Sequence, residues 1–400
     1  MRIVKLLCLA VAALITPLSR IVDRFWKFRI TAFNATRFGH LAADPQLYLA
    51  RLAAGESDGV RFRRFFCSEP CNRQLLRMWQ RLMPIHECRP LWAFYQYTFP
   101  VLHKSPVFRP LPPPDYCPNA HELVARAGGL LGFTAEEEAR GRELLAELGL
   151  AASDWFVCFN GRELSAADLD GNREHRNSRL DTYFKAARAI ADLGGYAIRV
   201  GLPANEPLPA EARHPRIIDY AFERRSEFGD IYLLAKCRFL VGCATGTINI
   251  PSLFGKAVAF ANMIPYGGHP NPRGLVAPKL LVDKRAGELM HFREVFDYLM
   301  SKNPRLGNPI FVDQYSDFEN DFVGLVDNTE DDIVDLCLDM LDQTAGQRPP
   351  AEAVALQREF KEIFYSWSPD RLAHAPNIGP RFALRHRRLI QAPGARAQSV

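Results

Sequence analysis

Between Trp155 and Asn262 the sequence alternates short apolar runs with longer amphipathic segments, and this alternation restricts the fold more than any other feature. Runs rich in Val, Ile and Phe predict buried strands, and the segments between them have the length of helices. Strands that alternate with helices in this way form a parallel sheet wrapped by crossover helices. The expected strands are 155–161, 196–201, 216–221, 238–242 and 257–262, and the expected helices are 180–193, 230–237 and 247–255.

The rest of the chain is long enough for a second domain. Four hundred residues, 48% of them hydrophobic and 24% charged, exceed one typical domain and allow a large core. Weaker strand and helix patterns before residue 115 predict another Rossmann-like domain, and the aromatic segment 90–103 is expected to be extended. The fold class is therefore α/β, with two Rossmann-like domains facing a cleft. The predicted parts are an apolar helix at 1–24, Rossmann-like domains at 25–150 and 151–345, a C-terminal helix packing back on the body at 346–385, and a flexible tail at 386–400.

Charge is concentrated at the two ends of the chain. The net charge is +5, and residues 1–30 carry +5 while residues 371–400 carry +6, which leaves −6 on the body between them. A body of this charge argues against nucleic-acid binding, which needs a basic face on the folded part. The basic ends fit either an anionic surface such as a membrane or plain solvation.

The nine cysteines are an odd number and include no Cys-x-x-Cys pair. Cys67 and Cys71 have no second pair at the spacing that zinc sites use. Several others lie in apolar runs, where a free thiol behaves as a small hydrophobic side chain. We therefore expect no metal, no bound cofactor and a cytoplasmic location.

An apolar run from Leu6 to Ile15 follows a basic start. The run is short for a bilayer span, and no Ala-x-Ala-like cleavage site follows it. Arg20 and Arg24, together with Phe25 and Trp26, suit a helix in the membrane interface. We predict contact with the inner-membrane surface, either peripheral or as a single anchor. A buried helix and a cleaved signal peptide are the alternatives.

The turn after strand 238–242 is rich in small and hydroxyl residues. The stretch "GCATGT" leads from the strand into a helix and places Thr245, Gly246 and Thr247 at the helix start. A helix N-terminus presents free N–H groups to phosphate, and glycine allows a ligand to approach closely. The same residues also suit a plain N-cap. We predict a diphosphate cradle here, touched by Thr245 rather than Thr247.

Charged side chains follow other strands of the same predicted sheet, at the edge where ligands of such sheets bind. Arg162 is expected to pair with a diphosphate oxygen, and the carboxylate of Glu163 is expected to accept a proton from a hydroxyl. Further ligand-binding candidates lie in a loop and at two strand ends: Arg176, Asn177, Arg199, Gly201, Asp219 and Tyr220.

The run 155–262, with "WFVCFNGRE", "HRNSRLDTYF" and "VGCATGTINIPSLFG", resembles a group of bacterial glycosyltransferases associated with surface-polysaccharide synthesis. It is more distantly similar to the GT-B fucosyltransferase superfamily, and "RFGHLA" near residue 38 matches the group's N-terminal loop loosely. The resemblance implies a GT-B-like fold, a nucleotide-sugar donor held by the C-terminal domain, an acceptor in the cleft and independence from a bound metal. It places Arg162 at the donor β-phosphate, Arg176-Asn177 at the family's Arg-Asn pair, and Thr245-Gly246 at the diphosphate turn.

Two positions depart from the family pattern: Asn160 stands where His is usual, and Glu163 stands where Asp is usual. Asn160 cannot act as a base, so Glu163 and His40 are the candidates for the group that deprotonates the acceptor. The predicted activity is transfer of a sugar from a nucleotide sugar to a glycan or lipid-linked glycan, with inversion implied by the superfamily. The alternatives are a two-Rossmann nucleotide-sugar epimerase and a nucleotide-sugar-binding protein that has lost catalysis.

Overall fold

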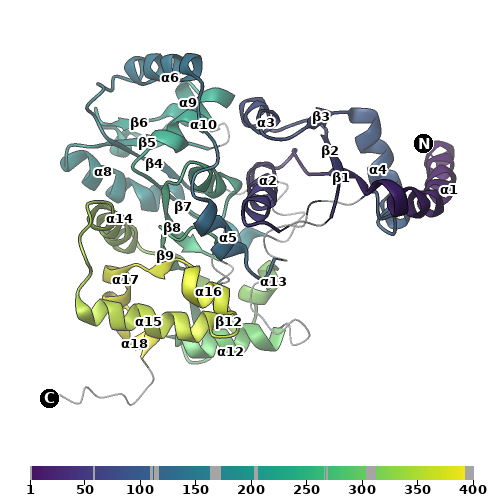
Figure 1. Ribbon diagram of the computed structural model, residues 1–400. Helices are drawn as coiled ribbons and strands as arrows, with labels where there is room; N and C mark the ends of the chain where they lie inside the picture. Colours follow the sequence, from purple (N-terminus) through teal and green to yellow (C-terminus); the bar gives the residue numbers. More distant parts are fainter. Residues whose placement is uncertain are drawn as a thin grey trace. The chain divides into compact units, whose positions relative to one another are not determined.

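The computed structural model describes residues 2–56, 59–108, 111, 117–162, 173–201, 206–264, 266, 269–302 and 312–391. The chain forms two compact units, Met1–Ala135 and Glu136–Val400 (Figure 1). Each unit contains a parallel sheet, so the predicted α/β class is confirmed and the two sheets agree with the predicted pair of Rossmann-like domains. Residues 392–400 of the predicted tail lie outside the described residues.

The division between the units follows Ala135, the first residue of helix α6 (Ala135–Glu147), whereas the sequence predicts it after residue 150. Glu138 on α6 explains this difference. Its carboxylate accepts hydrogen bonds from Tyr232 at 3.2 Å and from Lys236 at 2.7 Å, both on helix α10 (Glu227–Lys236) of the second unit. These side-chain contacts attach α6 to the second unit.

The first unit has a three-stranded parallel sheet in the order β1-β2-β3. Its strands are β1 (Phe28–Ala32), β2 (Phe62–Cys67) and β3 (Ile85–Glu87), connected by α2 (Phe38–Ala53) and α3 (Arg73–Gln80). The Asn72 side chain caps α3 by accepting from the Leu75 N–H at 2.8 Å, and the Trp79 indole donates to the Leu41 carbonyl at 2.9 Å. These bonds hold α3 against α2, and the unit is completed by α5 (Ala120–Ala127).

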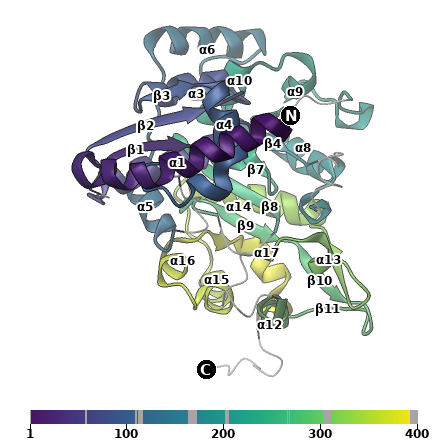
Figure 2. The ribbon, with the colours of Figure 1, turned by 90° about the vertical axis from the view of Figure 1, so that its right-hand side faces the viewer.

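Two further helices of the first unit pack together: α1 (Arg2–Trp26) and α4 (Arg89–Leu102) (Figures 1 and 2). The predicted N-terminal apolar helix is therefore present. The expectation that segment 90–103 is extended is wrong. Trp92, Tyr95 and Phe99 recur at helical spacing and pack as neighbouring rings, while Pro90 occupies the first turn, where proline is tolerated.

The second unit has a seven-stranded parallel sheet in the order β13-β9-β8-β7-β4-β5-β6. The predicted alternation is confirmed, although β6 is shorter than expected and β9 and β13 were not anticipated. The strands are β4 (Phe156–Asn160), β5 (Tyr196–Arg199), β6 (Ile217–Ile218), β7 (Phe239–Gly242), β8 (Ala257–Met263), β9 (Leu275–Pro278) and β13 (Asn377–Ile378). All residues of β4, β7 and β8 are buried, as strands covered on both faces require.

Helices cover this sheet on both faces. Helix α8 (Phe184–Asp192) packs on α14 (Glu330–Thr344) (Figure 1), and α10 packs on α11 (Ile250–Leu253). The remaining elements are α9 (Tyr220–Glu223), α12 (Phe292–Lys302), α13 (Tyr315–Phe318), α15 (Ala351–Tyr365), α16 (Pro369–His374), short 3₁₀ turns η2 to η5 at 174–176, 180–183, 210–212 and 246–249, and an antiparallel sheet of β10 (Leu280–Asp283), β11 (Glu288–Leu289) and β12 (Val323–Val326).

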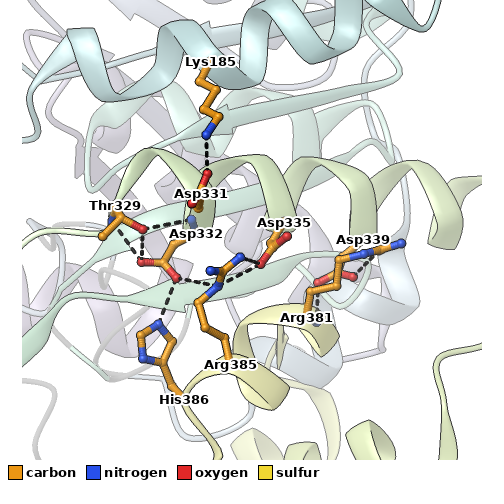
Figure 3. A network of polar contacts seen from close by, with 9 residues as sticks. All are labelled: Lys185, Thr329, Asp331, Asp332, Asp335, Asp339, Arg381, Arg385 and His386. Carbon is orange, nitrogen blue, oxygen red and sulfur yellow. Dashed lines mark hydrogen bonds and ion pairs between the residues drawn. The ribbon is translucent and has the colours of Figure 1, made fainter.

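The C-terminal segment folds back on α14 through ion pairs and hydrogen bonds (Figure 3). Asp332 closes a capping box with Thr329 and also accepts from His386 at 2.9 Å. Arg381 pairs with Asp339 at 2.5 Å, and Arg385 pairs with Asp335. These contacts fix α17 (Pro380–Arg385) and α18 (Arg387–Ile390) on the body and let β13 join the sheet edge.

Candidate functional site

The site begins where β4 and β7 end side by side. Asn160 and Gly242 are register partners at the carboxyl ends of these strands. Asn160 is buried, and its amide donates to the Thr245 hydroxyl at 3.2 Å. A Cβ at position 242 would overlap the Asn160 Oδ1 atom, so glycine is needed for this close approach. No group in the described part of the chain bonds that Oδ1 atom, which leaves one buried acceptor for a ligand.

Arg162 lies two residues beyond the end of β4 and reaches the same turn. Its guanidinium donates to the Ala244 carbonyl at 3.4 Å, and its own carbonyl accepts from the Ser178 N–H at 3.0 Å. The bare Gly161 backbone lies against the Ser178 carbonyl and Leu180, which permits this approach. Three segments that the sequence analysis selected separately, 160–162, 176–178 and 243–247, are therefore brought together.

The turn after β7 differs in detail from the predicted capped helix. Thr245 takes the N-cap position of η5 in extended conformation, but its side chain makes no cap hydrogen bond and instead accepts from Asn160. Thr247 is buried, whereas Thr245 and Gly246 are half-buried. The predicted helix consists of η5 followed by α11, each four residues long. Thr245 is therefore the hydroxyl that this turn presents at its surface.

The loop before α8 carries Arg176, whose guanidinium is bound by Asp313. Its Nε atom donates to Asp313 Oδ1 at 2.8 Å and its Nη2 atom donates to Oδ2. The same Oδ1 atom lies 2.8 Å from the Nε2 atom of His175, which is fully buried and stacked on Phe318. Burial lowers the pKa of His175. Burial alone would raise the pKa of Asp313, but hydrogen bonds from His175 and Arg176 hold it below its ordinary value.

Lys279, directly after β9, is a site residue that the sequence analysis missed. It is 3% exposed, and its ammonium donates to the Asn177 carbonyl at 2.5 Å and pairs with Asp327 at 2.7 Å. Burial raises the pKa of Cys243 to about 11, although the positive charges of Lys279 and Arg162 oppose that rise. Arg162 reaches the turn at Ala244, and Lys279 contacts Asn177, whose neighbour Ser178 bonds the Arg162 backbone. A lysine that interrupts the apolar run "LVAPKLLV" was the signal that could have identified it.

A network of buried polar side chains holds the loop before α8 through Ser178. Asn262, at the end of β8, donates to the Ser178 hydroxyl at 2.9 Å, and Ser178 also bonds the Tyr183 hydroxyl at 2.9 Å. Asn262 and Asn328 exchange backbone-to-side-chain bonds of 2.6 Å in both directions. Asn262 has φ of 50°, a left-handed conformation that asparagine tolerates better than most residues. The network fixes the backbone of 177–178 beside Arg162.

Four other predicted residues lie at the ends of β5 and β6, where their polar atoms bond to one another, to nearby backbone or to the Arg225 side chain. Arg199 donates to both carboxylate oxygens of Asp219, at 3.3 and 3.4 Å, and Asp219 also accepts from the Leu208 N–H at 2.7 Å. Tyr220 is fully buried and its hydroxyl donates to the Ser226 carbonyl. Gly201, with φ of 132°, accepts at its carbonyl from Arg225. A groove of about 520 Å³, lined in part by Leu208, His214 and Asp219, lies beside β6.

The two candidate bases are in different situations. His40, on α2 of the first unit, has its Nδ1 atom 3.2 Å from Asp44 Oδ2, and the Asp44 side chain is buried while that of His40 is 40% exposed. Glu163 lies outside the described residues. Among the residues that the structure describes, no group of three His, Cys, Asp or Glu side chains could hold a metal ion.

When the chain is compared with known proteins, the matches are to solved structures. No family model matches the chain and no curated protein matches it. Solved structures that match include a glycosyl transferase family 9 protein from Veillonella parvula DSM 2008, with 11% identity, TM-score 0.48, and coverage of 80% of this chain and 98% of that one. The E. coli ADP-heptose lipopolysaccharide heptosyltransferase II matches with 12% identity, TM-score 0.42, and coverage of 63% and 91%.

A third match is E. coli heptosyltransferase WaaC with ADP-2-deoxy-2-fluoro heptose, with 13% identity, TM-score 0.33, and coverage of 62% and 93%. None of these three proteins is named as a fucosyltransferase, so the predicted similarity to that superfamily stays a prediction. The chain is thus similar, at 11 to 13% identity, to structures titled as glycosyltransferases.

Proposed function

We propose that the protein is a glycosyltransferase that moves a sugar from a nucleotide-sugar donor to a glycan or lipid-linked glycan acceptor of surface-polysaccharide synthesis. The observation that carries the proposal is the gathering of Arg162, Lys279 and the Asn160–Thr245 pair around one turn at the carboxyl edge of a parallel sheet. That edge is where such sheets bind nucleotide ligands. The Arg162 guanidinium and the Thr245 hydroxyl match the chemistry of a diphosphate.

In this reaction an oxygen of the acceptor attacks the anomeric carbon, and the bond from that carbon to the diphosphate oxygen breaks. The electron pair leaves with the nucleoside diphosphate. Negative charge therefore grows on the diphosphate in the transition state, and fixed positive groups beside it lower the barrier. Arg162 supplies that charge in the proposed mechanism, while Lys279, buried and paired with Asp327, holds the Asn177 backbone beside it. Single displacement inverts the configuration of the anomeric carbon.

The acceptor hydroxyl loses its proton to a base, and the candidates are His40 and Glu163. His40 has the arrangement of a general base held by a carboxylate, because its Nδ1 atom contacts the buried Asp44. His40→Gln is expected to lower kcat by about 100-fold if His40 is the base. The matched control is His103→Gln, since His103 is an exposed histidine that bonds the Phe99 carbonyl. Equal activity of both variants would exclude His40 and leave Glu163 as the remaining candidate.

The test is a panel of nucleotide sugars, including ADP-heptose because related structures are titled for it, incubated with the protein with and without bacterial membrane extract. Nucleotide release that depends on the extract supports the transferase. Interconversion of the sugar without extract would identify an epimerase, and binding without turnover would identify a nucleotide-sugar-binding protein.

A chelator arm addresses metal dependence. We expect nucleotide release to continue in excess chelator, because protein side chains supply the positive charge beside the diphosphate. Loss of activity in chelator and its return with a divalent cation would overturn the predicted metal independence.

A further inference from the structure

Helix α1 leaves a long apolar stripe exposed on the first unit. Leu7, Leu14, Leu18 and Phe25 are 62, 69, 59 and 73% exposed, and Ile3 and Ile21 extend the stripe. At 100° per residue these positions fall on one side of the helix. A contiguous stripe of six exposed apolar side chains marks an interaction site.

The other side of α1 belongs to the core of the first unit. Ala12 is fully buried among Tyr95 and Leu102 of α4, and Ile15 packs on the same cluster. The Ser19 hydroxyl lies 2.7 Å from the Ser105 hydroxyl, just beyond α4. The middle of the helix is therefore held in the core of the first unit by Ala12, Ile15 and Ser19, and its apolar stripe points away from that core.

Charge beside the stripe identifies what covers it. Arg24 lies on α1 beside the stripe and Arg20 lies further round the helix, while the acid Asp23, on the side of the core, is paired with Arg29 and Lys27. A second copy of this helix would bring like charges together, whereas an anionic lipid surface would attract them. Trp26, which is 69% exposed, has the amphipathic ring that favours the lipid–water interface.

The contacts also indicate the orientation of α1. Residues Ile3–Trp26 are long and apolar enough to cross a bilayer by length and composition. The stretch without charge between Lys5 and Arg20 is, however, only 14 residues, or about 21 Å at 1.5 Å per residue, against about 30 Å of hydrocarbon. Spanning would also pull Ala12 and Ser19 away from the core of the first unit.

We propose that α1 docks in the plane of an anionic bilayer, with the stripe of Ile3, Leu7, Leu14, Leu18, Ile21 and Phe25 inserted into the lipid and Arg20 and Arg24 at the headgroups. This surface is independent of the chemistry at Arg162. It would hold the enzyme on the membrane from which a lipid-linked acceptor is reached.

The first test is flotation of the full chain with phosphatidylcholine vesicles that contain or lack about 30% phosphatidylglycerol. We expect binding to the anionic vesicles and at least tenfold weaker binding of Leu14→Glu/Leu18→Glu. The matched control is Leu52→Glu/Leu193→Glu, which changes two exposed leucines elsewhere and is expected to bind like the wild type. Unchanged circular dichroism shows that the variants fold.

The second test measures depth by brominated-lipid quenching of tryptophan placed singly at Leu7, Leu14 or Leu18, above the background of the native tryptophans. An in-plane helix gives the same shallow depth at all three positions, and a spanning helix gives a depth that changes along it. The proposal is overturned by a depth that changes along α1, by wild-type protein that does not bind anionic vesicles, or by a membrane-purified chain that begins after Trp26. A dimer that Leu14→Glu/Leu18→Glu dissociates, without a change in vesicle binding, would assign the stripe to a second copy.

Discussion

Two parts of the same sheet edge carry an arginine at or just beyond a strand end, yet the two arginines make different contacts. At the ends of β5 and β6, Arg199 and Asp219 are buried and bond each other and the backbone of the 206–208 segment. At the ends of β4 and β7, Arg162 contacts a backbone carbonyl of the turn, and Asn160 keeps a buried acceptor without a bond in the described part of the chain. We infer that the first pair stabilises the fold and that the second group binds ligand.

The largest expected effect is on stability at the β5–β6 end. Asp219→Ala leaves the buried Arg199 guanidinium without its carboxylate, which costs about 3–5 kcal/mol of the free energy of unfolding. Chemical denaturation measures this loss, and replacement of both residues by apolar side chains is expected to recover part of it. If Asp219→Ala is as stable as the wild type but no longer binds donor, then the β5–β6 end binds ligand and does not mainly stabilise the fold.

The next effect is on activity at the β4–β7 end. Arg162→Ala is expected to lower kcat/KM by about 100-fold, the order of magnitude for one lost group at a developing anion, with little change in Tm. Arg216→Ala is the matched control, because Arg216 also donates to a backbone carbonyl but precedes β6, at the opposite edge of the sheet. Equal activity of the two variants would remove Arg162 from the site.

A smaller effect, on the KM for the donor, is expected when a single methyl group is added at position 242. Gly242→Ala places a Cβ where Asn160 Oδ1 now lies, so the amide must turn and lose its bond to Thr245. We expect the donor KM to rise about tenfold, since one positioned hydrogen bond is worth about 1 kcal/mol or somewhat more. Gly132→Ala, at a glycine with open space around it, is the control for the change of residue type. Identical KM values in the two variants would show that Asn160 does not position donor.

The smallest effect concerns pH at the β5–β6 end. Burial raises the pKa of Asp230 to about 7, although Arg225 beside it opposes the rise. The folded state therefore holds this proton more tightly than the unfolded chain, whose aspartate titrates near 4. The associated stability is fully present below about pH 4 and is lost as the pH rises through about 7. The difference in Tm between about pH 5 and pH 8 should accordingly shrink in Asp230→Asn.

Asp331→Asn provides a comparison of opposite sign, because the hydrogen bond from Lys185 lowers the pKa of Asp331 at an exposed position. Its effect should be small. A pH dependence that is the same in Asp230→Asn and in the wild type would show that Asp230 does not titrate in this window.

The sequence predicted the sheet of the second unit well, because strand-to-helix alternation is a local pattern and the strand ends then share one edge. The shared edge predicts that 160–162, 176–178 and 243–247 lie together, and Arg162 contacts both Ala244 and Ser178. It did not reveal that Arg176 is held by Asp313, because the two residues are 137 positions apart and no local pattern connects them. The same is true of Lys279, whose importance depends on contacts with Asn177 and Asp327.

The first unit was predicted less well, for a different reason. Segment 90–103 is so rich in aromatic residues that it looks like a strand, yet its rings pack as neighbours along one side of α4. Tertiary packing on Ala12 and Phe66 decides the outcome, and β propensity is overridden. The contact between α1 and α4 is what shows which face of α1 is buried.

The most direct test of the account is a crystal structure of the protein with a nucleoside diphosphate bound. The account predicts the diphosphate within hydrogen-bond distance of the Arg162 guanidinium and the Thr245 hydroxyl, with Arg199 and Asp219 still paired. A diphosphate bound instead in the groove beside β6, against His214 and Asp219, would contradict the central claim.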